Sequence, residues 1–468
     1  MEGGPIASVT PISTNLAEFA AGLDYESIPA HVRERAKHLI LDAVGIAFAS
    51  TRYDYAHKTL TAARGLGGDG PVGIIGMPAR LAARDAALVN GVLVHGLDYD
   101  DTHTPGIIHS TASAFPCALS VAADRHLPGR EMLAGYIAAT ETATRVGAVA
   151  KSGFHQIGFH PTGMVGVFGC AIAAARMMGA TPQQIAMAQG IALSMAAGSL
   201  EFVEDGASTK RMHPGWAASS GITAAALARE GFTGPSKAYE GRFGLFAAYL
   251  GPREKDCDYT LATAGLGADW ELEVVAVKPY PACHFNHAAA DATLALMDAH
   301  GIGPDDVAHI RALVPEDAVK TVCEPVEQKR NPVNSYAAQF SIPYIIAACL
   351  ARGRFGLAEL EPDAVGDPAI RALAAKVDYE VDPDSPFPKF YSGEVVIETT
   401  DGRELRHREE VNRGASERPL TNDEVVAKYF DNATMAISRA RAEAVRDLVL
   451  GLDGLADTRA LSDGLSAG

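Results

Sequence analysis

A run of acidic and histidine side chains between residues 95 and 109 is the part of this sequence best suited to chemistry. The chain reads HGLDYDDTHTP from His95, and a further histidine, His109, follows it. Carboxylates and imidazoles in one segment suit general acid–base catalysis or metal binding. A turn that merely ends an apolar helix does not need so many ionisable groups. We therefore expect this run to form part of a functional site; the structural alternative is a helix end followed by an Asp-capped helix.

The spacing within this run argues against a metal site. A calcium loop that began at Asp98 would need glycine at its sixth position and glutamate at its twelfth. Those positions hold His103 and His109. The zinc signature HExxH does not occur, and the glycine-rich segment 65–70 lacks the Lys-Ser/Thr end of a phosphate loop. We therefore expect neither a metal ion nor an organic cofactor.

Three further clusters place histidine or lysine beside glycine and proline turns at expected helix starts. They read GFHQIGFHPTG at 153–163, STKRMHPG at 208–215 and KPYPACHFNH at 278–287. The first aims His160 at a helix N-terminus, which favours anions. In the second, Lys210, Arg211 and His213 form a compact positive site that can clamp a carboxylate. In the third, two prolines stiffen the segment after Lys278. Each cluster alone also fits a structural turn, but together they predict a site for a small anion.

The overall composition narrows the classes of function. The 468 residues carry a formal net charge of −17, and 48% of them are hydrophobic. So acidic a surface repels nucleic acid and anionic lipid, because binding to phosphates needs clustered lysine and arginine. The six cysteines lie far apart without a CxxC pair, which indicates reduced thiols. We see no signal-peptide pattern and no apolar run of membrane-spanning length. We expect a cytoplasmic protein that binds neither nucleic acid nor membrane.

The periodicity of apolar residues predicts a mostly α protein with two domains. Helical patterns cover much of 14–250, and helices return at 423–430 and 438–450, before a tail from 453 that is expected to fray. Alternating and β-branched residues predict strands at 271–277, 307–314, 377–381 and 393–399. We therefore expect a large all-helical domain, at 1–268 and 404–468, interrupted by a smaller α+β lid domain at 269–403.

The same clusters resemble the MmgE/PrpD family, which includes 2-methylcitrate dehydratase, cis-aconitate decarboxylase and iminodisuccinate epimerase. Five segments carry the resemblance: NGVLVHGLDYDDTH from Asn90, GFHPT from Gly158, KRMHPG from Lys210, EGFTGP from Glu230 and KPYPAC from Lys278. The resemblance extends from about residue 16 to 450. It implies a homodimer without metal or organic cofactor, and an active site in the cleft between the helical domain and the lid.

The resemblance also implies which side chains act. Those that correspond to the site of the decarboxylase branch, and to which we assign catalytic roles, are Asp98, Thr102, His109, His160, Lys210 and Lys278. Those that we expect to bind the substrate are His103, Arg211 and His213. Removing a proton next to a carboxylate builds charge on that carboxylate, which the basic side chains can stabilise while a histidine takes the proton.

Two departures from the decarboxylase pattern direct the choice of reaction. The stretch between Thr102 and His109 is one residue longer than in that branch, and the lid tyrosine of that branch has no match between Glu324 and Asn334. We therefore favour a lyase like 2-methylcitrate dehydratase, which eliminates water from a small di- or tricarboxylic acid. The alternatives are a dicarboxylate epimerase, a cis-aconitate-type decarboxylase and a binding protein that retains the fold.

Overall fold

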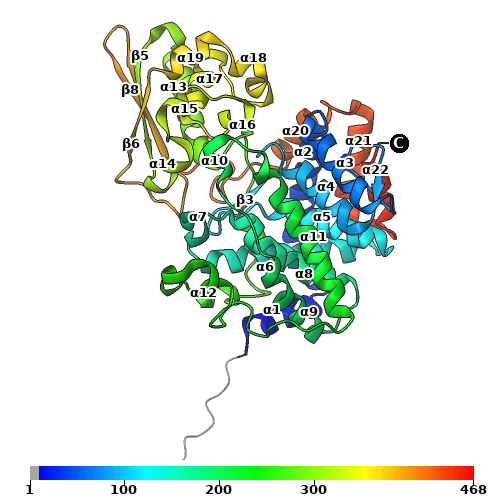
Figure 1. The fold of residues 1–468 in the computed structure, drawn as a ribbon. Helices are drawn as coiled ribbons and strands as arrows, with labels where there is room; N and C mark the ends of the chain where they lie inside the picture. The colour runs from blue at the N-terminus through cyan, green and yellow to red at the C-terminus, as the bar shows by residue number, and fades with distance from the viewer. Residues whose placement is uncertain (1–9, 468) are drawn as a thin grey trace, which may run out of the picture.

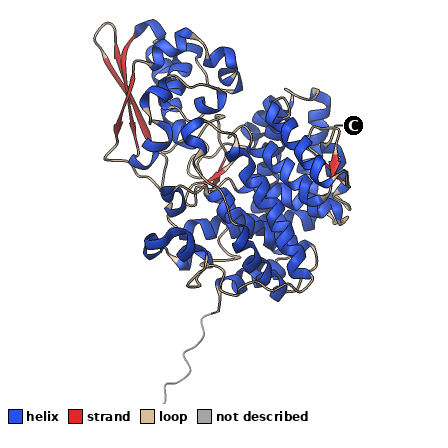
Figure 2. Ribbon diagram, viewed as in Figure 1, coloured by secondary structure: helices blue, strands red, loops and turns tan. Residues whose placement is uncertain are grey.

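The computed structural model describes residues 10–467, and helices make up most of its regular structure (Figure 1, Figure 2). The first part of the chain forms a helical body. Its helices are α1 Ile12–Gly22, α2 Ala30–Ser50, α3 Asp54–Gly67, α4 Ala83–His95, α5 Ser110–Asp124, α6 Gly129–Val149, α7 Gly153–Ile157, α8 Pro161–Met177, α9 Pro182–Ala192, α10 Phe202–Asp205, α11 Thr209–Arg229 and α12 Leu245–Leu250. The prediction of a mostly α protein is confirmed. Within the described residues, no helix is both long and apolar enough to cross a membrane.

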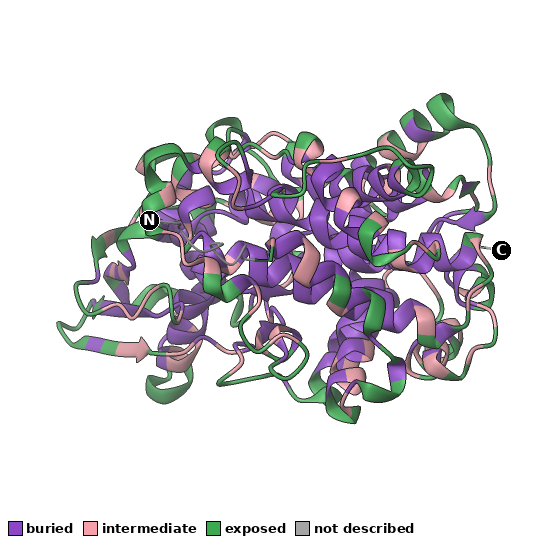
Figure 3. Ribbon diagram, turned by 90° about the horizontal axis from the view of Figure 1, so that it is seen from below, coloured by how far each residue is buried: buried purple, intermediate pink, exposed green. Residues whose placement is uncertain are grey.

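Small residues let the central helices of the body approach one another closely. A Cβ atom added to Gly91 of α4 would lie 2.5 Å from Cα of Gly215 in α11. One added to Gly169 of α8 would lie 2.3 Å from the carbonyl oxygen of Ala139 in α6. Larger side chains would force these helices apart, because the interior is close-packed. Figure 3 shows the resulting buried helices through the middle of the molecule. This packing fixes the ends of α4, α8 and α11, where the predicted site residues lie.

A smaller unit with its own core follows the body. Its sheet has the strand order β6-β5-β7-β8, with β5 Val307–Val314, β6 Val377–Val381, β7 Gly393–Thr399 and β8 Glu404–Glu409. Strands β5 and β6 are parallel, and the other neighbours are antiparallel. Helices α13 His287–His300 and α17 Ile342–Arg352 pack against this sheet, which lies at the outer edge of the unit (Figure 1). The unit's shorter helices are α14 Glu316–Val322, α15 Val326–Arg330, α16 Ser335–Ala338, α18 Pro362–Val365 and α19 Pro368–Ala374.

The chain then returns to the body. Strand β8 extends the sheet past residue 403, where the boundary was expected, because it pairs with β7. Helix α20 Asn422–Ala433 then packs on α2, and α21 Arg439–Leu450 follows it (Figure 1). The expectation of a frayed tail is wrong. Helix α22 Arg459–Leu465 packs against α5 and buries Leu461 and Leu465, because leucines four residues apart share one face of a helix.

Two other elements near the site differ from the sequence-based expectation. The segment 271–277 is not a full strand: a 3₁₀ turn, Glu271–Val274, leads into the short strand β4 Val275–Ala276. Strand β4 pairs with β3 Thr102–His103 and not with the sheet of the smaller unit. Helix α11 begins at Thr209, so the cluster at 208–215, which was expected as a turn at a helix start, lies within the helix, and Lys210 lies in its first turn. The β3–β4 pair and the first turn of α11 therefore hold predicted site residues in place.

Candidate active site

Asp98 is the centre of a buried charge cluster. It follows α4 in a left-handed conformation, with φ 49°, and its side chain is fully buried. Its Oδ1 atom lies 2.9 Å from Nζ of Lys210 and 2.8 Å from Nζ of Lys278. The Lys278 ammonium also donates to the Asp98 carbonyl oxygen, at 2.9 Å. Three segments that are far apart in the sequence therefore meet at one carboxylate.

The two ammonium groups keep Asp98 ionised. Burial alone would raise the pKa of this carboxyl, but Lys210 and Lys278 hold the pKa well below its usual value. The second carboxylate oxygen, Oδ2, has no hydrogen-bond partner among residues 10–467. Two positive charges thus face one negative charge at this point. An anionic ligand can share the ammonium groups with Asp98 without leaving a buried positive charge unpaired.

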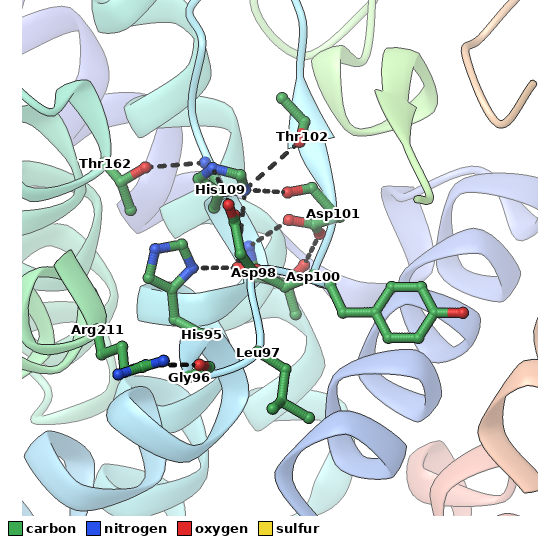
Figure 4. A network of polar contacts seen from close by, with 12 residues as sticks. His95, Gly96, Leu97, Asp98, Asp100, Asp101, Thr102, His109, Thr162 and Arg211 are labelled. Carbon is green, nitrogen blue, oxygen red and sulfur yellow. Dashed lines mark hydrogen bonds and ion pairs between the residues drawn. The ribbon is translucent and has the colours of Figure 1, made fainter. Parts of the chain in front are cut away.

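His109 is held in the form of a neutral base. It is the N-cap residue of α5, and its backbone N–H donates to Oγ1 of Thr162 at 3.0 Å (Figure 4). Its Nδ1 atom lies 2.7 Å from the carbonyl oxygen of Asp101. A carbonyl only accepts, so Nδ1 carries the proton and Nε2 keeps its lone pair. Nε2 lies 3.9 Å from Oδ1 of Asp98. Burial lowers the pKa of His109 well below its usual value, so the ring is neutral near pH 7.

A second neutral imidazole, His160, lies beside the first. It caps α8, and its Nδ1 atom is 3.0 Å from Nδ1 of His213. Its Nε2 atom is buried without a partner in the described part of the chain. Burial, and then the neighbouring His213, lower its pKa well below the usual value. The ring centroids of His109 and His160 are 5.8 Å apart. The site therefore holds two imidazoles that can exchange protons with one ligand.

The other two carboxylates of the acidic run have different environments. Asp100 lies 2.8 Å from Nδ1 of His95 (Figure 4), and the histidines overcome the effect of burial and lower its pKa to about 2. Asp101 bonds to the backbone N–H and hydroxyl of Thr111, yet burial raises its pKa to about 7. His95, Asp100 and Asp101 were not among the predicted site residues. The signal that could have found them is their place in the same run as Asp98.

The cluster opens on a cavity between the body and the smaller unit. The side chains expected to be catalytic all line it: Asp98, Thr102, His109, His160, Lys210 and Lys278. The smaller unit adds His284 and Tyr391, which sequence reasoning did not single out. Tyr391 lies in a loop without any motif, and His284 lies in the cluster at 278–287, of which only Lys278 was a predicted site residue.

The three side chains expected to bind substrate lie outside this cavity. Nε2 of His103 lies 2.9 Å from a carboxylate oxygen of Glu271, beside the β3–β4 pair. Arg211 donates to the carbonyl oxygen of Gly96 at 2.8 Å, and its guanidinium lies 4.0 Å from the centre of the Tyr336 ring. Nδ1 of His213 lies 3.0 Å from Nδ1 of His160, which lines the cavity. Each therefore contacts or lies near a segment that lines the cavity.

Comparison of the sequence with known protein families agrees with the site described above. The sequence profile of the MmgE/PrpD N-terminal domain matches residues 14–258, and that of the MmgE/PrpD C-terminal domain matches residues 280–453. The chain belongs to the MmgE/PrpD family. The resemblance that its motifs indicate is thereby confirmed. Lys278 lies between the two matched regions.

Several curated MmgE/PrpD relatives have similar length and a common name. Cis-aconitate decarboxylase of Aspergillus terreus is 28% identical over 469 residues, which are 95% of this chain and 94% of that protein. The human cis-aconitate decarboxylase is 28% identical over 468 residues, 96% of this chain and 94% of that protein. The mouse protein of the same name is 28% identical and covers 96% of this chain and 92% of its own length. The similarity therefore includes both walls of the cavity.

The MmgE/PrpD site also brings together groups that are close enough to hold a metal ion. The ring nitrogens of His95, His109 and His160 lie within 4.8 Å of one another, and so do ligand atoms of a second set, His95, Asp98, Asp100 and His109. Motif spacing did not reveal the first set, because folding brings His160 in from another helix, and the second set matches neither the calcium nor the zinc motif. A cation here would be repelled by the two ammonium groups beside Asp98. That the enzyme needs no metal stays a prediction, tested below.

Proposed function

We propose that this MmgE/PrpD protein is a lyase that releases carbon dioxide from a small tricarboxylic acid of the cis-aconitate type. One observation carries the proposal: two ammonium groups converge on a buried carboxylate beside two neutral histidines in one cavity. The names of the relatives support the choice of acid. The decarboxylase thus takes precedence over the dehydratase favoured on sequence alone.

The two lysines stabilise the charge that the reaction creates. When the bond to the departing carboxylate breaks, its electron pair spreads over the neighbouring double bond and a remaining carboxylate. Lys210 and Lys278 line the cavity where they can bind that carboxylate, and fixed charges in a largely buried site stabilise such a charge strongly. Asp98 keeps both ammonium groups in place, and the hydroxyl of Thr102 bonds to a substrate oxygen.

His109 supplies the proton that completes the product. An anion bound beside it favours the imidazolium form, so the ring takes up a proton on Nε2 as substrate binds. After carbon dioxide has left, His109 gives this proton to the carbon atom and becomes neutral again. His160 assists from the neighbouring position, and His213 orients it. The atoms balance: one carbon dioxide leaves and one solvent proton enters the product.

Apolar side chains in the lining of the cavity favour loss of charge from the reacting carboxylate. They include Ile107, Leu200, Phe202 and Phe340. An ionised carboxylate against such surfaces is poorly solvated, whereas carbon dioxide is neutral. The smaller unit acts as a lid over the cavity. We also propose that the enzyme is cytoplasmic and, from the family resemblance, that it is a homodimer. Its domain boundaries lie near residue 268 and after β8, which ends at Glu409.

Dehydration is the second candidate, because the histidine pair also suits this reaction. With ring centroids 5.8 Å apart, one of His109 and His160 can remove a proton while the other assists the leaving hydroxide. An epimerase would use the same pair on opposite faces of a dicarboxylate. These reactions need the same residues as decarboxylation but yield different products.

A substrate screen tests the proposal. Purified protein is incubated with cis-aconitate, 2-methylcitrate, citrate and iminodisuccinate, while released carbon dioxide is trapped and the acids are followed by proton NMR. We expect carbon dioxide from cis-aconitate and little change in the other acids. Loss of water from 2-methylcitrate without carbon dioxide would instead establish the dehydratase, and change of configuration alone would establish the epimerase.

Exhaustive chelation is expected to leave the activity intact. The two ammonium groups beside Asp98 supply the positive charge that a metal ion would otherwise provide. Turnover is measured before and after dialysis against chelator, with metal content determined in the same samples. Activity that disappears on chelation and returns with one divalent metal would contradict the metal-free mechanism and assign His95, His109 and His160 to that ion.

A further inference from the structure

The wall of the cavity that the smaller unit contributes carries a hydroxyl with no protein partner. Tyr391 lies just before β7, and its side chain is 2% exposed. Its hydroxyl oxygen is buried and forms no hydrogen bond with any residue from 10 to 467. Burial raises the pKa of this phenol, so the hydroxyl keeps its proton and can donate it in a hydrogen bond. Tyr391 lines the same cavity as Asp98 and the two lysines.

His284 lies next to Tyr391 and offers a second donor. The two rings meet edge to face, with centroids 4.8 Å apart. Nε2 of His284 lies 2.5 Å from the side-chain amide nitrogen of Asn412, which donates to it. The imidazole proton is therefore on Nδ1, and burial lowers the pKa to about 3, which keeps the ring neutral. Nδ1 is also buried without a partner in the described structure.

Two adjacent buried donors without acceptors indicate a missing ligand atom. Leaving such groups unpaired is unfavourable, and native proteins seldom do so without a functional reason. Both groups donate, so the complementary ligand is an oxygen acceptor. Lys210 and Lys278 line the same cavity, so two ammonium groups near these donors also favour an anion there.

We propose that Tyr391 and His284 form a second carboxylate subsite, which holds the carboxylate of the substrate farthest from the lysine pair. The proposal rests on the function proposed above and names its specificity determinant. A tricarboxylate spans both subsites and connects the body to the smaller unit. A shorter acid leaves both donors unpaired and binds less tightly.

The Tyr391→Phe variant tests this subsite by calorimetric binding of two unreactive acids. Tricarballylate has three carboxylates, and methylsuccinate is the same skeleton without one terminal carboxylate. We expect Tyr391→Phe to weaken the binding of tricarballylate by about ten- to a hundredfold, because a hydrogen bond to a charged acceptor is lost. Methylsuccinate should bind the variant and the wild type equally. His284→Leu should show the same selective loss, and thermal unfolding checks that each variant is folded.

The matched control is Tyr379→Phe. Tyr379 is a phenol of the same unit that donates to Glu324 at 2.7 Å, away from the cavity, so both acids should bind as they do to wild type. If Tyr391→Phe weakened the binding of both acids equally, Tyr391 would have a structural role and the proposed subsite would be overturned. Unchanged binding of tricarballylate, or no binding to wild type, would also overturn it. Because neither acid reacts, these results do not depend on which reaction the screen reveals.

Discussion

Replacing Lys278 by methionine is expected to lower kcat/KM by about ten- to a hundredfold. A charge-assisted contact to a substrate carboxylate contributes about 1.5 to 3 kcal/mol, and each 1.4 kcal/mol is a factor of about ten in rate. Methionine retains the apolar length of the side chain but removes the ammonium group that lies 2.8 Å from Asp98. Lys210→Met should show a loss of similar size, because Lys210 contacts the same carboxylate oxygen. Steady-state kinetics on the acid identified by the screen measures both.

Thermal unfolding separates loss of catalysis from loss of folding. Lys278 is fully buried, and removing one partner of a buried ion pair destabilises a protein by about 3–5 kcal/mol when the other charge is left unpaired. Lys278→Met leaves Asp98 paired with Lys210, and Lys210→Met leaves it paired with Lys278, so each single variant should stay folded while it loses activity. Lys376→Met is the matched control: this ammonium donates to the carbonyl oxygen of Val307 within the smaller unit. Near-normal turnover in both Lys210→Met and Lys278→Met would show that the anion binds elsewhere.

The second large effect is expected at His109. Glutamine in its place can still donate to the Asp101 carbonyl oxygen but cannot carry a proton to carbon. We expect turnover to fall by about 10²- to 10⁴-fold, the usual contribution of general acid–base catalysis. His160→Gln should cause a smaller loss, because His160 assists without delivering the proton. Single-turnover measurements in deuterium oxide follow product formation and deuterium incorporation together.

Deuterium incorporation also distinguishes the reactions. In the dehydration alternative, replacing the base abolishes exchange into recovered substrate, whereas replacing the other histidine slows product formation and leaves some exchange. In the epimerase alternative, each variant still exchanges from its own face. His103→Gln is the control, because this buried ring contacts Glu271 outside the cavity. Full turnover in both His109→Gln and His160→Gln would mean that these histidines are structural residues at helix starts and not catalytic ones.

Local patterns predicted the elements whose environment is periodic. The strands at 307–314, 377–381 and 393–399 lie in one sheet, and their alternation and β-branched residues are typical of that setting. The segment 271–277 has similar composition, yet most of it is not a strand, because β4 pairs with the two-residue strand β3. The prediction that the tail frays was wrong for a related reason. Packing of Leu461 and Leu465 stabilises a short helix that helix propensity alone does not stabilise.

Residue type predicted the chemistry of the site better than the direction of each side chain. Successive side chains on a helix point about 100° apart. Lys210 and His213, three positions apart on α11, therefore share a face and reach the Asp98 and His160 region. Arg211 points away from that face and contacts Gly96 and Tyr336 instead. Tyr391 had no signal at all, because its place in the cavity depends on how the smaller unit packs on the body.

The most direct test of the account follows cis-aconitate by proton NMR in deuterium oxide with wild-type enzyme and Lys278→Met. We expect wild type to release one carbon dioxide per turnover and to form a product with one deuterium. Recovered substrate stays unlabelled, because bond cleavage precedes protonation. Lys278→Met should form this product about ten- to a hundredfold more slowly. Unreacted cis-aconitate with the wild type, or an equally active Lys278→Met, would contradict a decarboxylase site built on Asp98 and its two lysines.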